Sequence, residues 1–408
     1  MSLKLKSNNN WALCPVDILL VVFKKLDIKS LLNCMNVNIY WRNTVEYYCE
    51  HVNLWKAMLQ NAIDDEGVTF AEKSNLGERE QFLIAQQWYN VTNTNVCLRH
   101  CYKFDSSIRN IYVHKDNLIV VTNNAVKYFN IMNFEHIKVI DKSCVRYEET
   151  SSMIVELLVA PEQKLSPLLT LTNKLHANYV DSENVKQIIL KDIDSYIVHL
   201  NSCYEYSCDR VLWMHTAKEI GWETKAMAKY HGIQQFCSLH IYKKNVYILL
   251  KCGSVLTPDT ECNMLVFLFR FPEQLIDWKP FMFHECSLLF KAPAPSERSV
   301  ALVQTRRHNS FVKIMPLRDG VTCVLEHGHI LILGREDGMI EIYLTRKLMD
   351  PSEANFPELK LNLMNYLCKP EPKSELSLRI TALEIHEDIY TGHHLFVSTM
   401  FNIYELLL

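Results

Sequence analysis

Glycine is scarce in this sequence, and its scarcity limits the kinds of site that the chain can build. Only 10 of the 408 residues are glycine, which is about a third of average usage. Neither the dinucleotide-binding pattern GxGxxG nor the phosphate-loop pattern GxxxxGKS/T occurs. Both patterns need glycine so that the backbone can approach phosphate groups closely. We therefore do not expect a nucleotide-dependent enzyme of either class.

Long hydrophobic runs and an excess of positive charge are also missing. The longest apolar runs, Ile18 to Phe23 and Met264 to Phe269, have six residues each, whereas a helix that crosses a bilayer needs about 20. Pro15 and Asp17 lie where a secretory signal would be uninterrupted. The net charge is −3, whereas nucleic-acid-binding domains carry a basic patch or stripe. We expect neither a membrane nor a nucleic acid as a partner.

Paired cysteine motifs are absent although the chain has 14 cysteines. The densest cluster is Cys97, His100 and Cys101, and no second pair of ligands follows it. A structural zinc site needs about four ligands, usually in two spaced pairs. We therefore expect reduced, mostly buried cysteines, no metal site and no cofactor.

The first sixty residues show the spacing of three or four short helices. Pro15 suits a first helical turn, apolar residues recur from Ile18 to Leu26 on one stripe, and Asp27 can cap a second helix. A third apolar pattern runs from Trp41 to Cys49. A bundle this small is near the lower limit of stability, and it has more large apolar side chains than it can bury. Either another chain or the C-terminal domain covers the surplus; the spacing does not decide between them.

The segment from Leu13 to Asp27 resembles the start of an F-box. It has the family's Pro at Pro15, an acidic residue two positions later, an aliphatic pair, a Val-Phe step and a Leu-Asp step. One departure is Cys14, which stands between Leu13 and the proline. The resemblance covers about residues 12 to 58 and continues through Leu31-Leu32, Val37, Trp41-Arg42 and Leu54-Trp55.

The resemblance implies docking on a Skp-family adaptor, which links F-box proteins to a cullin–RING ubiquitin ligase. It also implies a cytoplasmic or nuclear protein. The resemblance assigns ten residues to adaptor binding. Those that would face the adaptor are Leu13, Pro15, Ile18, Leu19, Val22 and Phe23. Those that would lie in the bundle core or at its edge are Leu26, Leu31, Val37 and Trp41.

An acidic segment follows, and it suggests a linker. A helix is expected from about Glu78 to Tyr89; we interpret it as a spacer helix between two domains, the alternative being a surface helix of the second domain. The sequence thus predicts an N-terminal tail at 1–11, an F-box helical domain at 12–60, the linker and spacer at 61–90, and a β-rich domain at 91–408.

From about residue 91 the hydrophobic period changes from 3.6 to 2, which indicates strands. Hairpins are expected within 118–128, 330–343 and 395–404, where turn-forming residues separate two apolar runs. A fourth hairpin would join 246–250 to 264–268 through a long polar connection at 251–263. Strand groups recur about every 45 residues, which is the size of a propeller blade.

This spacing predicts seven four-stranded blades. The hairpin at 330–343 resembles a WD repeat, with Asp337 in its turn and Tyr343 where that family places Trp, but the family's Gly-His dipeptide is missing. The expected fold is thus an α+β multidomain chain: a small helical F-box, a linker helix and a large all-β domain, most simply a seven-bladed degenerate WD-like β-propeller. A β-sandwich or another β-rich fold is the alternative.

No catalytic motif is recognisable, and histidines such as His327, His386 and the pair His393-His394 are expected to be structural. The resemblance implies a non-catalytic substrate-recognition subunit of an SCF-type ubiquitin ligase, with the propeller recruiting an unknown protein substrate. The alternative is a non-degradative scaffold that holds protein partners. Glu336 stands where phosphopeptide receptors of the family carry Arg, so phosphopeptide binding is not implied. The insertion at 251–263 and four basic residues are the candidate substrate contacts; the basic residues are Arg306, Arg307, Arg335 and Arg346.

Overall fold

A computed structural model shows a chain of two compact units. One unit comprises residues 1–70 and 74–88, and the other comprises 71–73 and 89–408. The structure describes residues 14–66, 76–93, 95–158, 168–175, 187–242, 245–259, 261–271, 279–284, 287–291, 299–306, 310–328, 330–344, 357–366, 378–389 and 391–408.

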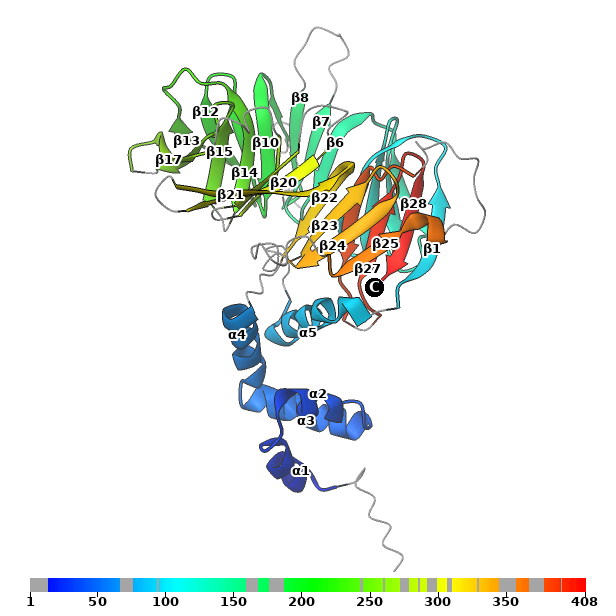
Figure 1. Cartoon of the computed structure of the whole chain (residues 1–408). Coiled ribbons are helices and arrows are strands. Elements are labelled where there is room, and N and C mark those ends of the chain that lie inside the picture. Colours follow the sequence, from blue (N-terminus) through cyan, green and yellow to red (C-terminus); the bar gives the residue numbers. More distant parts are fainter. Residues whose placement is uncertain are drawn as a thin grey trace, which may run out of the picture. The chain divides into compact units, whose positions relative to one another are not determined.

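The first unit is helical (Figure 1). Its described helices are α1 (Val16–Phe23), α2 (Ile28–Cys34), α3 (Ile39–His51), α4 (Leu54–Glu66) and α5 (Glu78–Tyr89). Side-chain caps define where two of them start. Asp27 Oδ1 accepts a hydrogen bond from the backbone N–H of Ser30 at 2.8 Å, and Asn38 Oδ1 accepts one from the N–H of Trp41 at 2.8 Å. Such caps satisfy N–H groups that have no partner within the helix, so the predicted cap at Asp27 is confirmed.

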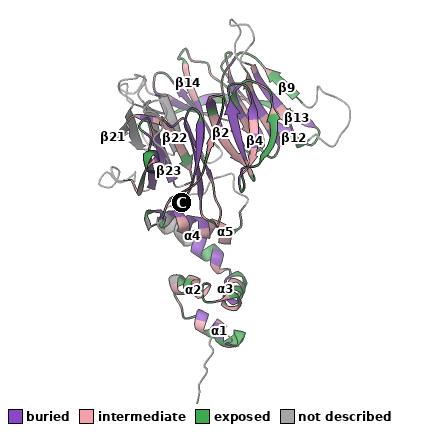
Figure 2. Ribbon diagram, turned by 90° about the vertical axis from the view of Figure 1, so that its right-hand side faces the viewer, coloured by how far each residue is buried: buried purple, intermediate pink, exposed green. Residues whose placement is uncertain are grey.

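One apolar core joins all five helices (Figure 2). Its buried residues are Cys14, Leu19, Phe23, Leu31, Val45, Cys49, Trp55, Met58, Leu59 and Phe82. Helix α5 enters this core through Phe82, and Arg79 on the same helix lies 2.5 Å from Glu46 Oε1 of α3. The Arg79 guanidinium also packs over the ring of Trp55 at 5.9 Å. Helix α5 therefore belongs to the helical unit and is not a surface helix of the β unit; its role as a spacer stays a prediction.

The second unit is built from antiparallel four-stranded groups, which we call blades 1 to 7. Blade 1 contains β2 (Ile108–His114), β3 (Asn117–Thr122), β4 (Val126–Asn130) and β5 (His136–Ile140), and blade 2 contains β6 (Cys144–Glu149), β7 (Met153–Leu158), β8 (Leu168–Asn173) and β9 (Gln187–Leu190). Blade 3 contains β10 (Ile193–His199), β11 (Ser202–Ser207), β12 (Val211–Lys218) and β13 (Gly221–Lys229), and blade 4 contains β14 (Phe236–Tyr242), β15 (Asn245–Leu250), β16 (Ser254–Asp259) and β17 (Met264–Arg270). Blade 5 contains β18 (Lys279–His284), β19 (Ser287–Lys291), β20 (Ser299–Arg306) and β21 (Ser310–Asp319); blade 6 contains β22 (Val321–His327), β23 (Ile330–Arg335), β24 (Met339–Leu344) and β25 (Leu359–Asn362); and blade 7 contains β26 (Ala382–His386), β27 (His394–Ser398), β28 (Asn402–Leu407) and β1 (Cys97–Lys103).

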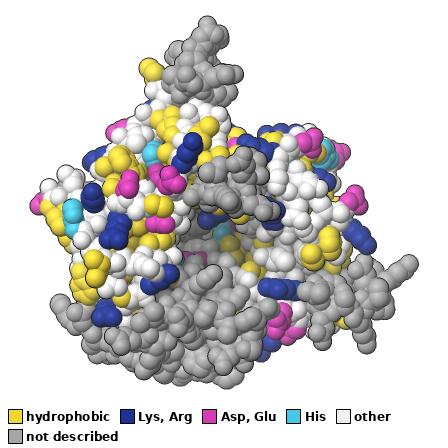
Figure 3. Space-filling model, turned by 90° about the horizontal axis from the view of Figure 1, so that it is seen from above, with side chains coloured by type: hydrophobic (Ala, Val, Ile, Leu, Met, Phe, Trp, Pro, Cys, Tyr) yellow, Lys and Arg dark blue, Asp and Glu magenta, His cyan; other side chains and the backbone are white. Residues whose placement is uncertain are grey.

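The blades surround a central hollow, which Figure 3 shows from above. Within blades 1 to 6 the strands follow one another in chain order, and one parallel pair between Lys229 and Met264 connects the last strands of blades 3 and 4. The fold is a β-propeller, and the described strands give it seven blades. The predicted fold class is thus confirmed, and the β-sandwich alternative is wrong.

The last blade is closed by the first strand. Strand β1 pairs antiparallel with β28, from Cys97 opposite Leu407 to Lys103 opposite Asn402. The two chain segments that form this blade are almost 300 residues apart in sequence, a separation of about one whole ring of blades. Closure removes the open sheet edges that would otherwise invite pairing with another chain.

An irregularity recurs at the start of the inner strand of each blade from 1 to 6. The pairing of the first strand with the second slips there by one residue, which marks a β-bulge. In blade 1 the slip lies between Ile108 and Asn110, and in blade 6 it lies between Val321 and Cys323. Bulges at such rims bend a strand and re-aim its side chains. The repeat is therefore structural although the sequences of the blades differ.

Three of the four predicted hairpins are present, as β3–β4, β23–β24 and β27–β28. The fourth was wrong, because β15 does not pair with β17. Strand β16 lies between them and pairs with both. Val255 and Leu256 on β16 are buried, so much of 251–263 is an inner part of blade 4 and not a binding insertion. Strand β16 is short, ends in Thr-Pro-Asp and lies among turn residues, so its sequence does not show the alternation of apolar and polar residues by which a strand is recognised.

A buried carboxylate holds the closing blade together. Glu405 on β28 has no exposed side-chain surface, and its two oxygens each lie 2.7 Å from a histidine nitrogen, Nδ1 of His394 on β27 and Nδ1 of His100 on β1. Arg99 on β1 lies 3.4 Å away. Burial by itself raises the pKa of Glu405, but the two histidine hydrogen bonds and the Arg99 charge outweigh it and hold the pKa below its usual value of 4.5.

We predict that Glu405→Gln lowers the free energy of unfolding by about 2 kcal/mol at pH 7, because charge-assisted hydrogen bonds across three strands are weakened. A carboxyl group with a lowered pKa gives stability that is present above its unfolded pKa and lost as the pH falls through the lowered value. The difference in the free energy of unfolding between Glu405→Gln and the wild type should therefore become smaller below pH 4.5. Urea unfolding followed by circular dichroism measures both effects. Exposed Glu135→Gln is the control, and equal stability of all three proteins at pH 7 would contradict the prediction.

Candidate adaptor- and substrate-binding surfaces

Helix α1 is apolar on two opposite faces. Leu19 and Phe23 are four residues apart, share one face, and are completely buried in the helical core. Ile18 and Val21 lie on the other side of the helix and are 51% and 63% exposed. Residues three or four apart share a helix face. The same apolar run therefore contributes side chains to the core from one face and exposes apolar side chains on the other.

More apolar side chains are exposed near the turn that joins α2 to α3. Val37 is 55% exposed and Ile39 is 67% exposed, and Ile28 at the start of α2 is partly exposed. Large aliphatic side chains at such exposures are ordinary when scattered singly, but several on one small unit indicate an interaction surface. The apolar surplus expected from the sequence is therefore present on the helical unit.

The structure separates the ten residues assigned to adaptor binding into three groups. Leu19 and Phe23, which were expected to face the adaptor, are instead buried in the helical core, and Leu31 lies in that core, as expected. Val22, Leu26 and Trp41 are half-buried, whereas Pro15, Ile18 and Val37 are exposed. Leu13 lies outside the described residues. The error for Leu19 and Phe23 has a simple cause: a helix that is apolar all round does not reveal from its sequence which face turns inward.

One of the four basic substrate candidates can be placed with its side chain. Arg335 ends β23, where its guanidinium lies 2.9 Å from Asp337 Oδ2 and 3.6 Å from Glu341 Oε1. It therefore braces the turn of its own blade. Arg306 lies in β20, and Arg307 and Arg346 lie outside the described residues. A role for these residues in substrate binding stays a prediction.

The face that Figure 3 shows carries both signs of charge. Lys and Arg side chains are interspersed with Asp and Glu side chains among the described residues of this face. Between blades 3 and 4 a polar pocket of about 280 Å³ has the same mixed character, since it combines Arg210 and Lys251 with Asp194. A surface of mixed sign gives no long-range field that would select polyanions.

Histidines end the first strand of several blades, and one of them contacts the next blade, a feature that sequence reasoning missed. His114, His199, His327 and His386 each end the first strand of their blade. His327 Nε2 lies 3.1 Å from Glu387 Oε1 of the next blade. The sequence contained a signal for this feature, because a histidine recurs at the end of each of these strands.

The described residues contain no group of three or more His, Cys, Asp or Glu side chains that could hold a metal ion. Cys97 and Cys101 are exposed on β1, and His100 between them contacts Glu405. None of the described helices has the length and apolar character of a membrane span.

Comparison with known protein families matches residues 11–52 to the F-box domain. The chain carries an F-box. The match ends inside the helical unit, near the end of α3. No curated protein matches the chain. The resemblance noted in the sequence is thereby confirmed for the N-terminal unit.

Among solved structures, the β-propeller domain of Cps50 (Swd1) from Myceliophteria thermophila is similar to this F-box chain, with a TM-score of 0.50 and 8% sequence identity. The likeness covers 77% of this chain and 100% of that domain. BamB from Moraxella catarrhalis is similar with a TM-score of 0.43 and 8% identity, covering 77% of this chain and 98% of that one. At such identities the first likeness supports the propeller fold alone.

Substitutions on the two faces of α1 should have different effects on stability. Phe23→Ala should lower the free energy of unfolding of the F-box unit by about 3 kcal/mol or more, because it leaves a cavity in the core beside Trp41. Ile18→Ala and Val21→Ala should each change it by no more than about 0.5 kcal/mol, because both side chains are already exposed. Chemical unfolding followed by tryptophan fluorescence measures these changes. A larger loss from Ile18→Ala than from Phe23→Ala would reverse the assignment of the faces.

Proposed function

We propose that the protein is a substrate-recognition subunit of an SCF-type ubiquitin ligase. Its F-box docks on a Skp-family adaptor, which links it to the cullin–RING core, and its propeller recruits a protein for ubiquitination. The observation that carries the proposal is the F-box match at 11–52 on a unit whose first helix has an exposed apolar face. Ubiquitin transfer belongs to other subunits of such a ligase, so the receptor itself acts without catalysis.

The exposed apolar residues support this arrangement in energetic terms. Ile18 and Val21 are already about half buried, so completing their burial is worth about half of the roughly 1.5–3 kcal/mol that a fully exposed side chain would give. Clustered anchors of this kind are typical of the small set of residues that dominate an interface. The buried residues Leu19 and Phe23 act indirectly, because they fix the orientation of α1 and hence of its outer face.

The propeller supports the recruiting role, because it is a large closed scaffold with loops at both ends of its blades. Loops on a rigid framework are common sites of recognition. The same fold is equally suited to a scaffold that holds partners without degrading them. A receptor and such a scaffold differ in the fate of their bound partners, which a cellular measurement can follow.

Adaptor docking is tested by a double substitution on the outer face of α1. In co-expression with a Skp-family adaptor, Ile18→Asp with Val21→Asp should abolish co-purification while the helical content and unfolding midpoint stay unchanged, because two charges would be desolvated in an apolar contact. Tyr47→Asp, also an exposed position but on α3, provides a matched control for adding charge to the helical unit. Undiminished adaptor binding by the folded double variant would refute docking through this face.

Degradative function is tested by the dependence of partners on the cullin. Proteins that associate with the propeller should accumulate when the cullin is inhibited, and they should also accumulate when the Ile18→Asp, Val21→Asp variant replaces the wild type. Pulse-chase measurement of their lifetimes gives the readout. Lifetimes that are the same under all three conditions would exclude a substrate receptor and favour the scaffold.

A further inference from the structure

The polar pocket of about 280 Å³ between blades 3 and 4 combines several hydrogen-bond donors with few groups that satisfy them. We call it the interblade pocket. Its lining comes from the turn between β11 and β12, from the segment that leads into β14, and from the turn between β15 and β16. The volume is just below the range of about 300–1,000 Å³ that is typical of small-molecule sites. The pocket therefore suits a small group or one terminal residue of a chain, and not a long segment.

Two cationic side chains line this pocket, and both are held by neutral partners. The Arg210 guanidinium donates a hydrogen bond to the carbonyl oxygen of Gly232. Lys251 Nζ donates one to Gln235 Oε1 at 3.0 Å. Among the described residues neither cation forms an ion pair. These contacts fix the positions of the two cations and leave their positive charge uncompensated, which favours an anionic ligand.

One acidic side chain limits which anion the pocket accepts. Asp194 is the extra residue of the β-bulge at the start of β10, where the pairing with β11 slips between Ile193 and Ser195. Its carboxylate lies 3.7 Å from the Cys208 thiol, and within the described part of the chain it has no cationic partner. Two cations against one carboxylate attract a single negative charge. A phosphate group carries nearly two negative charges at pH 7, and Asp194 repels the second, so the pocket favours a carboxylate.

A buried tyrosine supplies a donor that has no partner. Tyr206 lines the pocket and is only 1% exposed, with its ring stacked on Phe236 at a centroid distance of 4.7 Å. Its hydroxyl forms no hydrogen bond with any described residue, although buried tyrosines usually have a partner. Burial, and after it the charge of Asp194, raises the pKa of Tyr206 to about 12 against the opposing effect of Arg210. The phenol is therefore neutral at pH 7 and can donate to an anion beside these charges.

We propose that the interblade pocket binds the C-terminal carboxylate of a polypeptide. The carboxylate pairs with Arg210 and Lys251 and accepts a hydrogen bond from the Tyr206 hydroxyl, while Asp194 accepts the backbone N–H of the same terminal residue. A chain end carries both groups on one Cα atom, so both fit into a small pocket, whereas a side-chain carboxylate lies farther from its own N–H. Capture of a chain end is an established mode of peptide recognition. The inference deepens the proposed function and rests on it, since the chain end would belong to a protein that the propeller recruits.

The probe is the peptide acetyl-Ser-Gly-Ser-Ala with a free C-terminal carboxylate, titrated against the full chain and followed by saturation-transfer NMR, which detects weak binding. It should bind saturably, and the same peptide with a C-terminal amide should bind at least about fivefold more weakly, because charge-assisted contacts are lost. Acetyl-Ser-Glu-Ser-Ala with a C-terminal amide places the carboxylate on a side chain, and it should also bind more weakly than the probe. Added salt should weaken the binding of the probe.

Substitutions in the pocket test each assigned contact. Arg210→Gln and Lys251→Gln should each weaken binding of the probe about fivefold, and Tyr206→Phe should weaken it about threefold without any change of charge. Lys225 offers a matched control, because it is an exposed cation on β13 of the same blade and does not line the pocket. Lys225→Gln should therefore bind the probe as the wild type does. Unfolding midpoints check that the variants are folded, and Lys251→Gln keeps the test valid if Arg210→Gln loses stability with its contact to Gly232.

The role of Asp194 is tested by a change of selectivity. A phosphoserine peptide with a C-terminal amide should bind the wild type more weakly than the probe does. Asp194→Asn should strengthen binding of this phosphopeptide more than binding of the probe, because a group with two negative charges gains more from the loss of the carboxylate. Tighter binding of the phosphopeptide by the wild type would identify a phosphate pocket instead and overturn the proposal.

The proposal is also overturned by an absence of saturable binding, by equal binding of the acid and amide peptides, by equal or tighter binding of the peptide with the side-chain carboxylate, or by equal losses from Arg210→Gln, Lys251→Gln and Lys225→Gln. These failures are distinguishable from failure of the proposed function, because the peptide is titrated without the adaptor or the cullin. If the probe does not bind but the adaptor and the cullin-dependent partners do, the receptor role stands and the interblade pocket is rejected. If the probe binds but partner lifetimes do not depend on the cullin, the pocket stands and the ligase role is rejected.

Discussion

Pairing of β1 with β28 is the contact on which the β unit depends. Every other blade is formed by consecutive strands, but blade 7 is complete only when the strand at the start of the domain meets the strand at its end. Glu405 reinforces this closure from a fully buried position, because it contacts side chains of β27 and β1 at once. Closing the ring with a segment almost 300 residues away costs loop-closure entropy during folding. The charged hydrogen bonds of Glu405 help to offset this cost.

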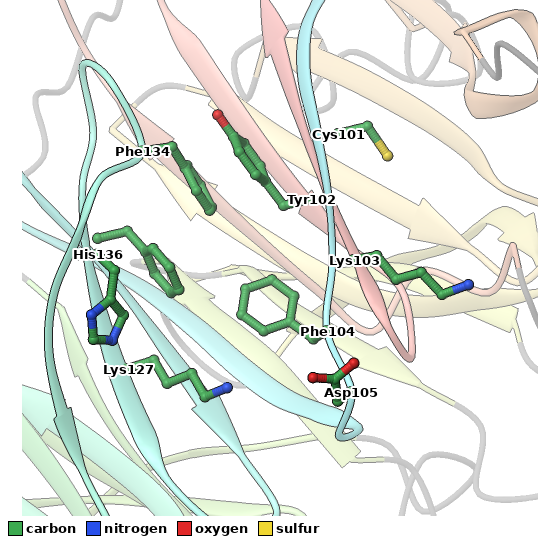
Figure 4. Close-up of a pocket in the computed structure, with 9 residues that line it drawn as sticks. Cys101, Tyr102, Lys103, Phe104, Asp105, Lys127, Phe134 and His136 are labelled. Carbon is green, nitrogen blue, oxygen red and sulfur yellow. The ribbon is translucent and has the colours of Figure 1, made fainter.

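The same closure leaves a cavity beside blade 1. A pocket of about 420 Å³ lies where the end of β1 meets blade 1, and aromatic rings from both sides line it (Figure 4). The segments that closure brings together therefore pack through aromatic side chains as well as through the β1–β28 pairing.

The helical unit follows a different constraint. It is too small to bury all of its large apolar side chains, so each helix face that turns inward leaves another apolar face outside. Helix α1 is the extreme case, with Leu19 and Phe23 in the core and Ile18 and Val21 at the surface. Stability and recognition therefore use the same short segment but different side chains.

The amino-acid sequence by itself determined the F-box, because its apolar and proline positions are local and closely spaced, and it determined the seven-fold repeat of strand groups through the change of hydrophobic period. Asp27 as a helix cap and three of the hairpins were likewise evident, since caps and tight turns are decided by neighbouring residues. Tertiary structure alone decided which face of α1 is buried, that β16 lies inside blade 4, and that Glu405, His394, His100 and Lys127 lie beside the closing seam. These outcomes depend on contacts between residues far apart in the chain, and such contacts leave no periodic signal in the sequence.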